Sequence, residues 1–183
     1  MSINFRPLTK HDVNFSRAID LYKEAFPDIQ RIPPWILQYK VGKGKAGSSI
    51  IYDHDTWVGF IYITEYKDIV FIQFFAISES CRSAGYGSKV IDSIRNQYFE
   101  KRIVLNIEEL DEHADNNHQR IKRKAFYEKN GFSSSGYLVK EPGEQLEMLI
   151  LGGSISKEEI EAMYKHLFGY ILSFFFRPEV IKI

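Results

Sequence analysis

The chain has 183 residues, a length that suits one domain with a substantial hydrophobic core. Apolar residues make up 44% and charged residues 26%, proportions that are ordinary for a globular protein and exclude a disordered chain. The 24 basic and 24 acidic side chains give zero formal net charge, which argues against nucleic acid as the main partner because phosphate binding depends on a basic excess.

The sequence pattern over residues 1–77 predicts two helices and four strands. Apolar residues one turn apart, ended by Pro27, predict a helix over 9–26 after a strand at 3–8. The Pro33-Pro34 pair is suited to begin a second short helix. Residues 69–77 are a nearly continuous β-branched and aromatic run, typical of a strand that is buried on both faces. The remaining strands are expected as a hairpin over 49–52 and 57–65, with its turn at 53–55.

The second half of the chain begins with a tight turn of small residues at 82–88 and then alternates helices and strands. Apolar residues at the 3.6 period predict a helix from this turn to Tyr98. Asn130-Gly131 is a C-cap signal that ends a basic helix, and Ser156 with Glu159 forms a capping-box pair that begins a tail helix. The other expected elements are the basic helix over 118–130 and strands over 102–109, 132–139 and 145–151, the last two joined by a turn at Pro142-Gly143.

The expected elements contain no internal repeat and no linker, so we predict one domain over residues 1–183. The single cysteine, Cys81, excludes an internal disulfide and favours a reducing cytoplasm. The N-terminal residues lack the pattern of a signal peptide. The longest apolar run, 167–176, is shorter than the ~20 residues of a membrane helix. We therefore expect a cytoplasmic protein with no membrane partner.

The turn at 82–88 carries the clearest chemical signal. Gly85 and Gly87 allow the backbone to bend sharply and to approach a ligand with no Cβ in the way. The free N–H groups of the following helix start point outward, and the helix dipole adds partial positive charge there. Arg82 is placed to add a charge-assisted contact. Together these features predict a site for a pyrophosphate.

Two other kinds of glycine-rich loop match this sequence less well. A dinucleotide-binding loop is disfavoured because Val90 stands where its third glycine would be, and because the motif lies in mid-chain. Residues 42–48 lack the lysine after the last glycine and follow a helix instead of a strand, which excludes a nucleotide-triphosphate loop.

The chain contains the motif R-x-x-G-x-G as Arg82-Ser83-Ala84-Gly85-Tyr86-Gly87. Through this motif it resembles the GNAT acetyltransferases. Residues 126–132 are similar to the family's second signature, a helix that ends in a tyrosine before a Gly-Phe pair. The element order over 3–151 is also the family's. The resemblance implies an α/β (α+β) fold with a mixed, mostly antiparallel central sheet flanked by helices. Its core would cover 1–152, and an extra C-terminal helical extension 153–183.

The resemblance also implies acetyl-coenzyme A (acetyl-CoA) as donor and assigns residues to it. A primary amine attacks the thioester directly in a ternary complex, and the leaving thiolate takes a proton from Tyr127. A phenol of pKa ~10 is neutral at pH 7 and can hydrogen-bond a thiolate of pKa ~8.5; packing beside Phe126 is the structural alternative for Tyr127. The pantetheine arm would pair with a strand whose N–H groups stabilise the oxyanion, and the pyrophosphate would lie on the glycine turn. The residues so assigned are Phe75, Ala76 and Ile77 for the arm, and Arg82, Ser83, Ala84, Gly85, Tyr86, Gly87 and Ser88 for the pyrophosphate.

The amine must lose a proton, and the nearest candidate bases are Glu108 and Glu109 at the end of a strand. Strand alternation puts Glu108 on the face of Val104 and Asn106, and Glu109 on the opposite face. We favour Glu108, while solvated strand-end charges are the alternative for both residues.

The chain departs from the family in the basic helix. Arg120 and Arg123 stand where the family commonly has asparagine and alanine. Together with Lys122 and Lys124 they predict a solvated basic face; the alternative is that one of the four contacts the 3′-phosphate or an acidic substrate. The histidines and acids near His113 are interpreted as a polar loop, with no metal assigned.

Two questions stay open from the sequence. The apolar stripe of the tail helix packs either on the chain's own sheet or in a homodimer, and the run Phe174-Phe175-Phe176 favours the dimer. The acceptor is a small-molecule or peptide amine whose identity the sequence does not give. A non-catalytic acyl-CoA sensor on the same fold is the alternative function.

Overall fold

The computed structural model describes residues 2–9, 12–26, 47–141, 144–175 and 178–183, with the backbone alone for residues 48 and 168–175. The second helix expected from Pro33, and the turn at Pro142-Gly143, lie outside these residues. The structure divides into two compact units, Met1–Thr64 with Ile72–Gln97 and Glu65–Phe71 with Tyr98–Ile183.

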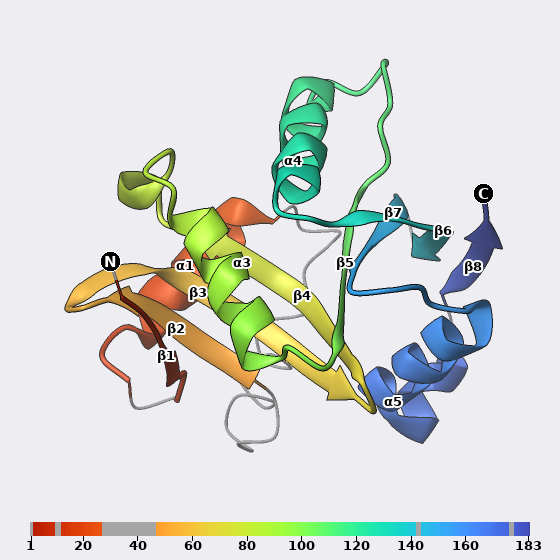
Figure 1. The fold of residues 1–183 in the computed structure, drawn as a ribbon, viewed down its shortest axis with the longest axis horizontal. Coiled ribbons are helices and arrows are strands. Elements are labelled where there is room, and N and C mark those ends of the chain that lie inside the picture. Colours follow the sequence, from red (N-terminus) through yellow and green to blue (C-terminus); the bar gives the residue numbers. More distant parts are fainter. Residues whose placement is uncertain (1, 10–11, 27–46, 142–143, 176–177) are drawn as a thin grey trace. The chain divides into compact units, whose positions relative to one another are not determined.

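In the first unit, two helices cover opposite faces of an antiparallel sheet, with α3 in front of the sheet and α1 behind it in Figure 1. Tyr22 of α1 is fully buried in an aromatic core with Phe60 and Phe74. The register of β1 with β2 places Ile3 opposite Asp53. The elements are β1 (Ile3–Pro7), α1 (Phe15–Ala25), β2 (Gly47–Asp53), β3 (Thr56–Tyr66), β4 (Ile69–Ile77), the 3-10 helix η2 (Glu79–Cys81) and α3 (Tyr86–Gln97); the turn between β3 and β4 belongs to the second unit.

Helix α1 begins six residues later than the sequence predicted. The backbone N–H of Asn14 donates to the Asp12 carboxylate at 2.7 Å, and the N–H of Phe15 donates to the Asp12 carbonyl at 3.0 Å. An aspartate that binds the backbone two residues on offers the chain a turn in place of a helix. The helix therefore starts only after this turn.

The second unit is an antiparallel sheet in the order β5-β7-β6-β8 with two helices. Figure 1 shows α4 above these strands and α5 below them. Ile160, Met163 and Tyr164 of α5 are buried against Val104 and Met148. This described part of the tail helix thus packs on its own unit's sheet. The elements are β5 (Arg102–Glu108), α4 (Asn117–Lys129), β6 (Ser133–Glu141), β7 (Glu144–Leu151), α5 (Lys157–Phe175) and β8 (Glu179–Lys182).

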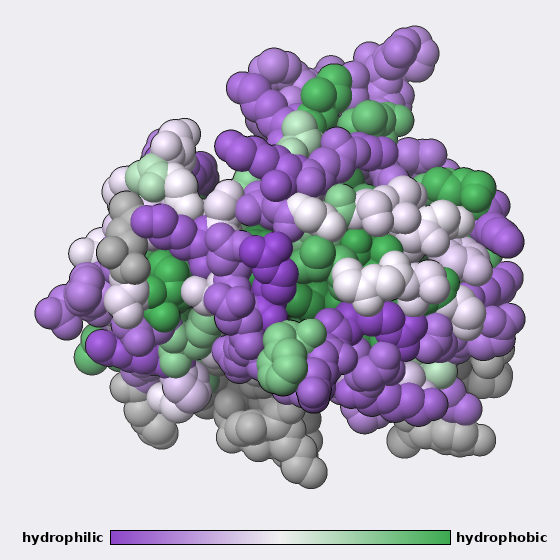
Figure 2. All heavy atoms as spheres, viewed as in Figure 1, coloured by the Kyte–Doolittle hydropathy of each residue, from purple (hydrophilic) through white to green (hydrophobic). Residues whose placement is uncertain are grey.

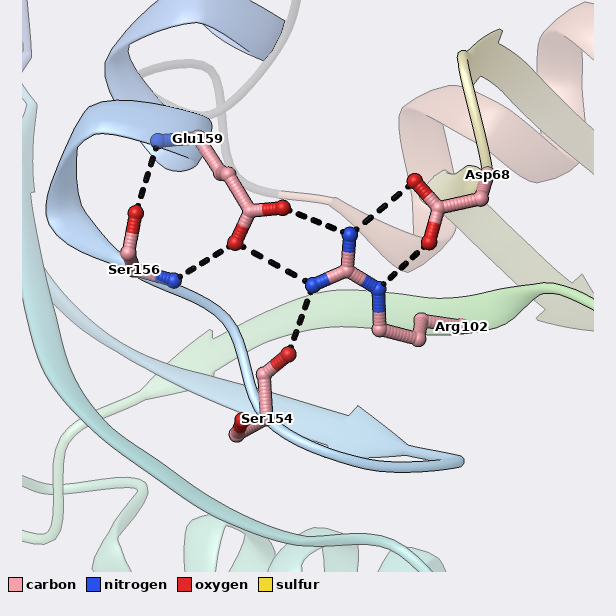
Figure 3. Close-up of polar contacts among 5 residues, drawn as sticks. All are labelled: Asp68, Arg102, Ser154, Ser156 and Glu159. Carbon is pink, nitrogen blue, oxygen red and sulfur yellow. Dashed lines mark hydrogen bonds and ion pairs between the residues drawn. The ribbon is translucent and has the colours of Figure 1, made fainter.

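The predicted capping box of the tail helix is confirmed. The N–H of Glu159 donates to Ser156 Oγ at 3.2 Å, and the N–H of Ser156 donates to Glu159 Oε2 at 2.9 Å. The Glu159 carboxylate also binds Arg102, which reaches Asp68 and the Ser154 carbonyl as well (Figure 3). One guanidinium therefore joins the β3–β4 turn, the start of β5 and the start of α5.

The predicted architecture of helices flanking a mostly antiparallel sheet is confirmed, including the extra C-terminal helix. Strand β8, which pairs with β6, was not predicted. Within the described ranges, no helix is both long enough and apolar enough to span a membrane.

Candidate active site

The glycine turn forms an exposed bend that leads directly into α3. Ser83 and Gly85 have left-handed φ angles of 62° and 79°, a conformation that turns successive N–H groups toward one side. A Cβ placed on Gly85 would meet no atom within 4 Å. Glycine is therefore required here for its backbone conformation, and the space in front of it is open to a ligand.

The first turn of α3 offers backbone donors. The N–H of Lys89 donates to the Gly85 carbonyl at 3.3 Å and closes the first turn. The N–H groups of Tyr86, Gly87 and Ser88 precede this bond and have no partner inside the helix. These donors fit the predicted pyrophosphate site, since an anion is favoured at a helix N-terminus.

Arg82 lies in this bend, and its guanidinium has protein partners. Nε donates to the Ile77 carbonyl at 3.1 Å, and Nη2 pairs with Glu24 of α1 at 2.9 Å. Both charged side chains are about half exposed, so the pair is open to exchange with another anion. In this arrangement Arg82 ties the end of β4 to α1.

At the end of β4, buried and partly buried side chains alternate, as expected for a β-strand. Phe74 and Ala76 are buried in the first unit's core, whereas Phe75 and Ile77 are only partly buried. Gly59 of β3 lies so close to this end that a Cβ on it would meet the Ala76 carbonyl oxygen at 2.1 Å. The close approach of two backbones thus fixes Phe75 to Ile77, the segment expected to pair with the pantetheine arm.

Tyr127 is held by the end of helix α4. The N–H of Phe132 donates to the Tyr127 carbonyl at 3.1 Å, and the N–H of Gly131 donates to the Glu128 carbonyl at 3.0 Å. Gly131 has a left-handed φ of 89°, and the rings of Tyr127 and Phe132 pack 5.5 Å apart. These contacts define a Schellman cap with its hydrophobic contact. The second signature in the sequence is therefore a capping device that orients the tyrosine.

The Tyr127 side chain is buried, with 9% of its surface exposed. Burial raises the pKa of its phenol to about 12, while the nearby positive charge of Arg123 acts in the opposite direction. At pH 7 this phenol is therefore neutral, and the raised pKa makes it a weaker acid than a free tyrosine.

Glu108 and Glu109 have different surroundings. The Glu108 carboxylate is buried, with 4% exposed, and forms an ion pair with Arg123. Glu109 is partly exposed, and its Oε2 accepts a hydrogen bond from Gln145 Nε2 at 2.7 Å. Because a guanidinium already binds Glu108, these contacts favour Glu109 as the freer carboxylate.

The basic residues of α4 are largely used inside the second unit. Arg120 donates to the Glu109 carbonyl at 2.7 Å, and Lys124 pairs with the buried Glu147 at 2.7 Å. Arg123 pairs with Glu108, and Lys122 alone of the four basic residues is exposed as a solvated basic face requires. The contact of one of these residues to the 3′-phosphate or to an acidic substrate stays a prediction. Figure 2 shows the outer surface of α4 as mostly hydrophilic.

Three further observations concern residues that have no role predicted from the sequence. Cys81 is buried, and its Sγ lies 3.8 Å from the Trp57 carbonyl. Among the described residues, no group of three or more histidine, cysteine or acidic side chains is placed to hold a metal ion. The residue that sequence reasoning missed is Asp53, which accepts a hydrogen bond from the Tyr86 hydroxyl at 3.1 Å. No short-range pattern signals that contact, because the two residues are 33 positions apart.

An open glycine turn before a helix, on a mostly antiparallel sheet, defines the acyl-CoA N-acyltransferase class of fold. The domain model of the acetyltransferase (GNAT) family matches residues 45–134. The resemblance seen in the sequence is therefore confirmed: the chain is a GNAT-fold protein that carries this family's domain. None of the curated proteins matches the chain.

Solved structures share the fold at low sequence identity. A GNAT-family acetyltransferase from Bacteroides thetaiotaomicron has a TM-score of 0.74 and 22% identity, over 92% of this chain and 97% of its own. Spermidine N-acetyltransferase from Vibrio cholerae, solved with CoA and spermine, has a TM-score of 0.60 and 14% identity, over 81% and 94%. A GNAT acetyltransferase from Elizabethkingia anophelis, with acetyl-CoA bound, has a TM-score of 0.56 and 14% identity, over 82% and 98%.

Proposed function

We propose that this protein is an N-acetyltransferase that moves the acetyl group of acetyl-CoA to a primary amine. The observation that carries the proposal is the open first turn of α3, where free N–H groups follow the left-handed Gly85. The match of residues 45–134 to the GNAT domain supports it. The solved relatives that hold CoA or acetyl-CoA support the choice of donor.

The proposed reaction needs no covalent enzyme intermediate. The amine nitrogen forms a bond to the acetyl carbon, the carbon–sulfur bond breaks, and the sulfur leaves as a thiolate that takes the proton of Tyr127. The amine proton passes to Glu109 or Glu108, acting as base or through water. The backbone N–H groups of the segment from Phe75 to Ile77 stabilise the oxyanion. The pyrophosphate binds the amides of residues 82–88.

The acceptor belongs to the class of small-molecule or peptide amines. The Vibrio cholerae relative was solved with spermine, and it acts on spermidine, which makes polyamines the first acceptors to try. We further propose that the protein works in the cytoplasm and that the tail helix, whose side chains beyond residue 167 are not described, contributes to a homodimer. Size-exclusion chromatography with light scattering tests the dimer.

The donor is tested by thermal unfolding with acetyl-CoA, coenzyme A and NAD side by side. A ligand at 100 times its Kd that binds only the folded state adds ~2.7 kcal/mol of stability. We expect a rise in Tm with both coenzymes and none with NAD. No rise with either coenzyme would overturn the proposal. If the protein bound the coenzyme but gave no product from any amine in a broad pool, the result would point instead to the non-catalytic sensor. Tyr127→Phe is the matched control for the turnover measurement.

A further inference from the structure

Asp53 is a buried carboxylate in the first unit, with 7% of its surface exposed. Oδ1 accepts the backbone N–H of Ser2 at 2.6 Å, and Oδ2 accepts the Tyr86 hydroxyl at 3.1 Å. Asp53 is the last residue of β2 and lies opposite Ile3 in the register with β1. A single side chain thus joins β1, the β2–β3 hairpin and the start of α3.

Tyr86 has a special position among these contacts. It is the first residue of α3 and lies inside the R-x-x-G-x-G turn, between Gly85 and Gly87. The preceding residues, from Arg82 to Gly85, are exposed, and two of them have left-handed backbone. At its first residue the bend is held by the Arg82 side chain, which binds the Ile77 carbonyl and Glu24. The Tyr86 side chain anchors the first helical turn to the rest of the unit.

The charge states of Asp53 and Tyr86 favour the hydrogen bond between them at neutral pH. The hydrogen bond from Ser2 lowers the pKa of the Asp53 carboxyl, and burial together with Asp53 raises the pKa of the Tyr86 phenol. Asp53 is therefore an anion and Tyr86 a neutral donor throughout the neutral pH range. A hydrogen bond from a neutral hydroxyl to a carboxylate is stronger than one between neutral groups.

We propose that Asp53 and Tyr86 are positioning residues for the coenzyme: their hydrogen bond fixes the first turn of α3, whose backbone N–H groups bind the pyrophosphate. This inference rests on the proposed function. It assigns a role to the Tyr86 side chain in addition to the role of its backbone. Neither residue touches the reacting atoms, so the effect should appear in coenzyme affinity and not in the chemical step.

Tyr86→Phe removes one hydroxyl and keeps the ring. We expect the Kd for coenzyme A, measured by titration calorimetry, to rise roughly tenfold, the size of effect when one hydrogen bond to a charged group is lost. Tyr98→Phe is the matched control, since that hydroxyl bonds the exposed Glu65 at 3.3 Å and should leave the Kd unchanged. Asp53→Asn keeps the shape of the acceptor, loses its charge, and should weaken coenzyme binding in the same way.

Two further measurements distinguish a positioning role of Asp53 and Tyr86 from a role in the stability of the fold alone. The ³¹P resonances of the bound pyrophosphate should shift in Tyr86→Phe and Asp53→Asn but not in Tyr98→Phe. The double variant should bind no more weakly than the weaker single variant, because both substitutions act on the same contact. A Kd within twofold of wild type in folded Tyr86→Phe and Asp53→Asn would overturn the inference. Failure of the wild-type protein to bind coenzyme A would instead remove the proposed function on which it rests.

Discussion

The Arg102 guanidinium binds three other residues of the second unit, and its removal gives a sharp prediction. It makes two hydrogen bonds to Asp68 at 2.8 and 3.0 Å, two to Glu159 at 3.1 and 2.7 Å, and one to the Ser154 carbonyl at 2.6 Å (Figure 3). Arg102→Met keeps an apolar stem and removes all five. Asp68 lies in the β3–β4 turn, whereas Ser154 and Glu159 lie at the start of α5, so the substitution removes the side chain that joins these two segments.

The magnitude follows from the exposure of the partners. The Arg102 side chain is 17% exposed, whereas Asp68 and Glu159 are 54% and 40% exposed and can regain water. Exposed ion pairs contribute about 0–1 kcal/mol each, and the hydrogen bond to the Ser154 carbonyl contributes about 1 kcal/mol. We therefore expect Arg102→Met to lose about 2 kcal/mol of unfolding free energy and to lower Tm by roughly 4–8 °C.

Urea unfolding followed by circular dichroism measures this loss, with an unchanged m-value showing that the unfolded state is unaltered. Arg102→Lys keeps the charge but cannot form paired contacts, so its loss should be intermediate. Arg95→Met, which removes an exposed pair with Asp92, is the matched control and should lose less than about 0.5 kcal/mol. An Arg102→Met protein as stable as Arg95→Met would refute the reasoning.

The same contacts predict a pH dependence. Arg102 lowers the pKa of the Asp68 and Glu159 carboxyls below their ordinary values. A carboxyl with a lowered folded pKa stabilises the protein above its unfolded pKa of about 4, and this stabilisation is lost as pH falls through the folded value. The stability difference between wild type and Arg102→Met should therefore be full at pH 7 and shrink below about pH 4.

Three other substitutions test the site. Tyr127→Phe should lower kcat about 100-fold or more, the usual contribution of a general acid, while the Kd for acetyl-CoA stays within twofold; an unchanged kcat would remove Tyr127 from the mechanism. Gly131→Ala places a side chain at φ 89° with its Cβ 3.2 Å from Leu151 Cδ1, so we expect a loss of about 1–2 kcal/mol in urea unfolding together with reduced kcat. Gly59→Ala drives a Cβ against the Ala76 carbonyl at 2.1 Å, and differential scanning calorimetry should show a larger fall in Tm than for Gly131→Ala.

Local patterns predicted those elements whose ends are decided by neighbouring residues. The strand over residues 69–77 was predicted with the bounds that β4 has, because a continuous apolar run ends at polar residues on both sides. The capping pair Ser156–Glu159 and the Asn130-Gly131 stop are likewise local devices. Strand β8 was missed because its four residues form a strand only through pairing with β6. Its identity depends on a partner about 40 residues away, which a short window does not contain.

The same limit explains what was missed at the site. The motif was found because its residues lie within one six-residue stretch, and of its two glycines only Gly85 has a left-handed φ. The partners of Arg82, Glu108 and Tyr86 were not found, because each contact joins segments that are distant in sequence. A run of charged residues in the sequence therefore does not by itself predict what its side chains contact. In the basic run of α4, Arg123 and Lys124 pair with the buried carboxylates of Glu108 and Glu147, which the sequence pattern did not predict.

The two compact units also separate the proposed roles. The residues assigned to the coenzyme, 75–77 and 82–88, belong to the first unit, and Tyr127 belongs to the second. Each set is fixed by contacts within its own unit, the turn through Asp53 and the tyrosine through the cap at Gly131. Substitutions at Asp53 should consequently change the Kd for coenzyme and spare kcat, whereas substitutions at Gly131 should do the reverse. If both variants changed Kd and kcat together, the two sets of residues would act as one cooperative assembly and the division of roles would be wrong.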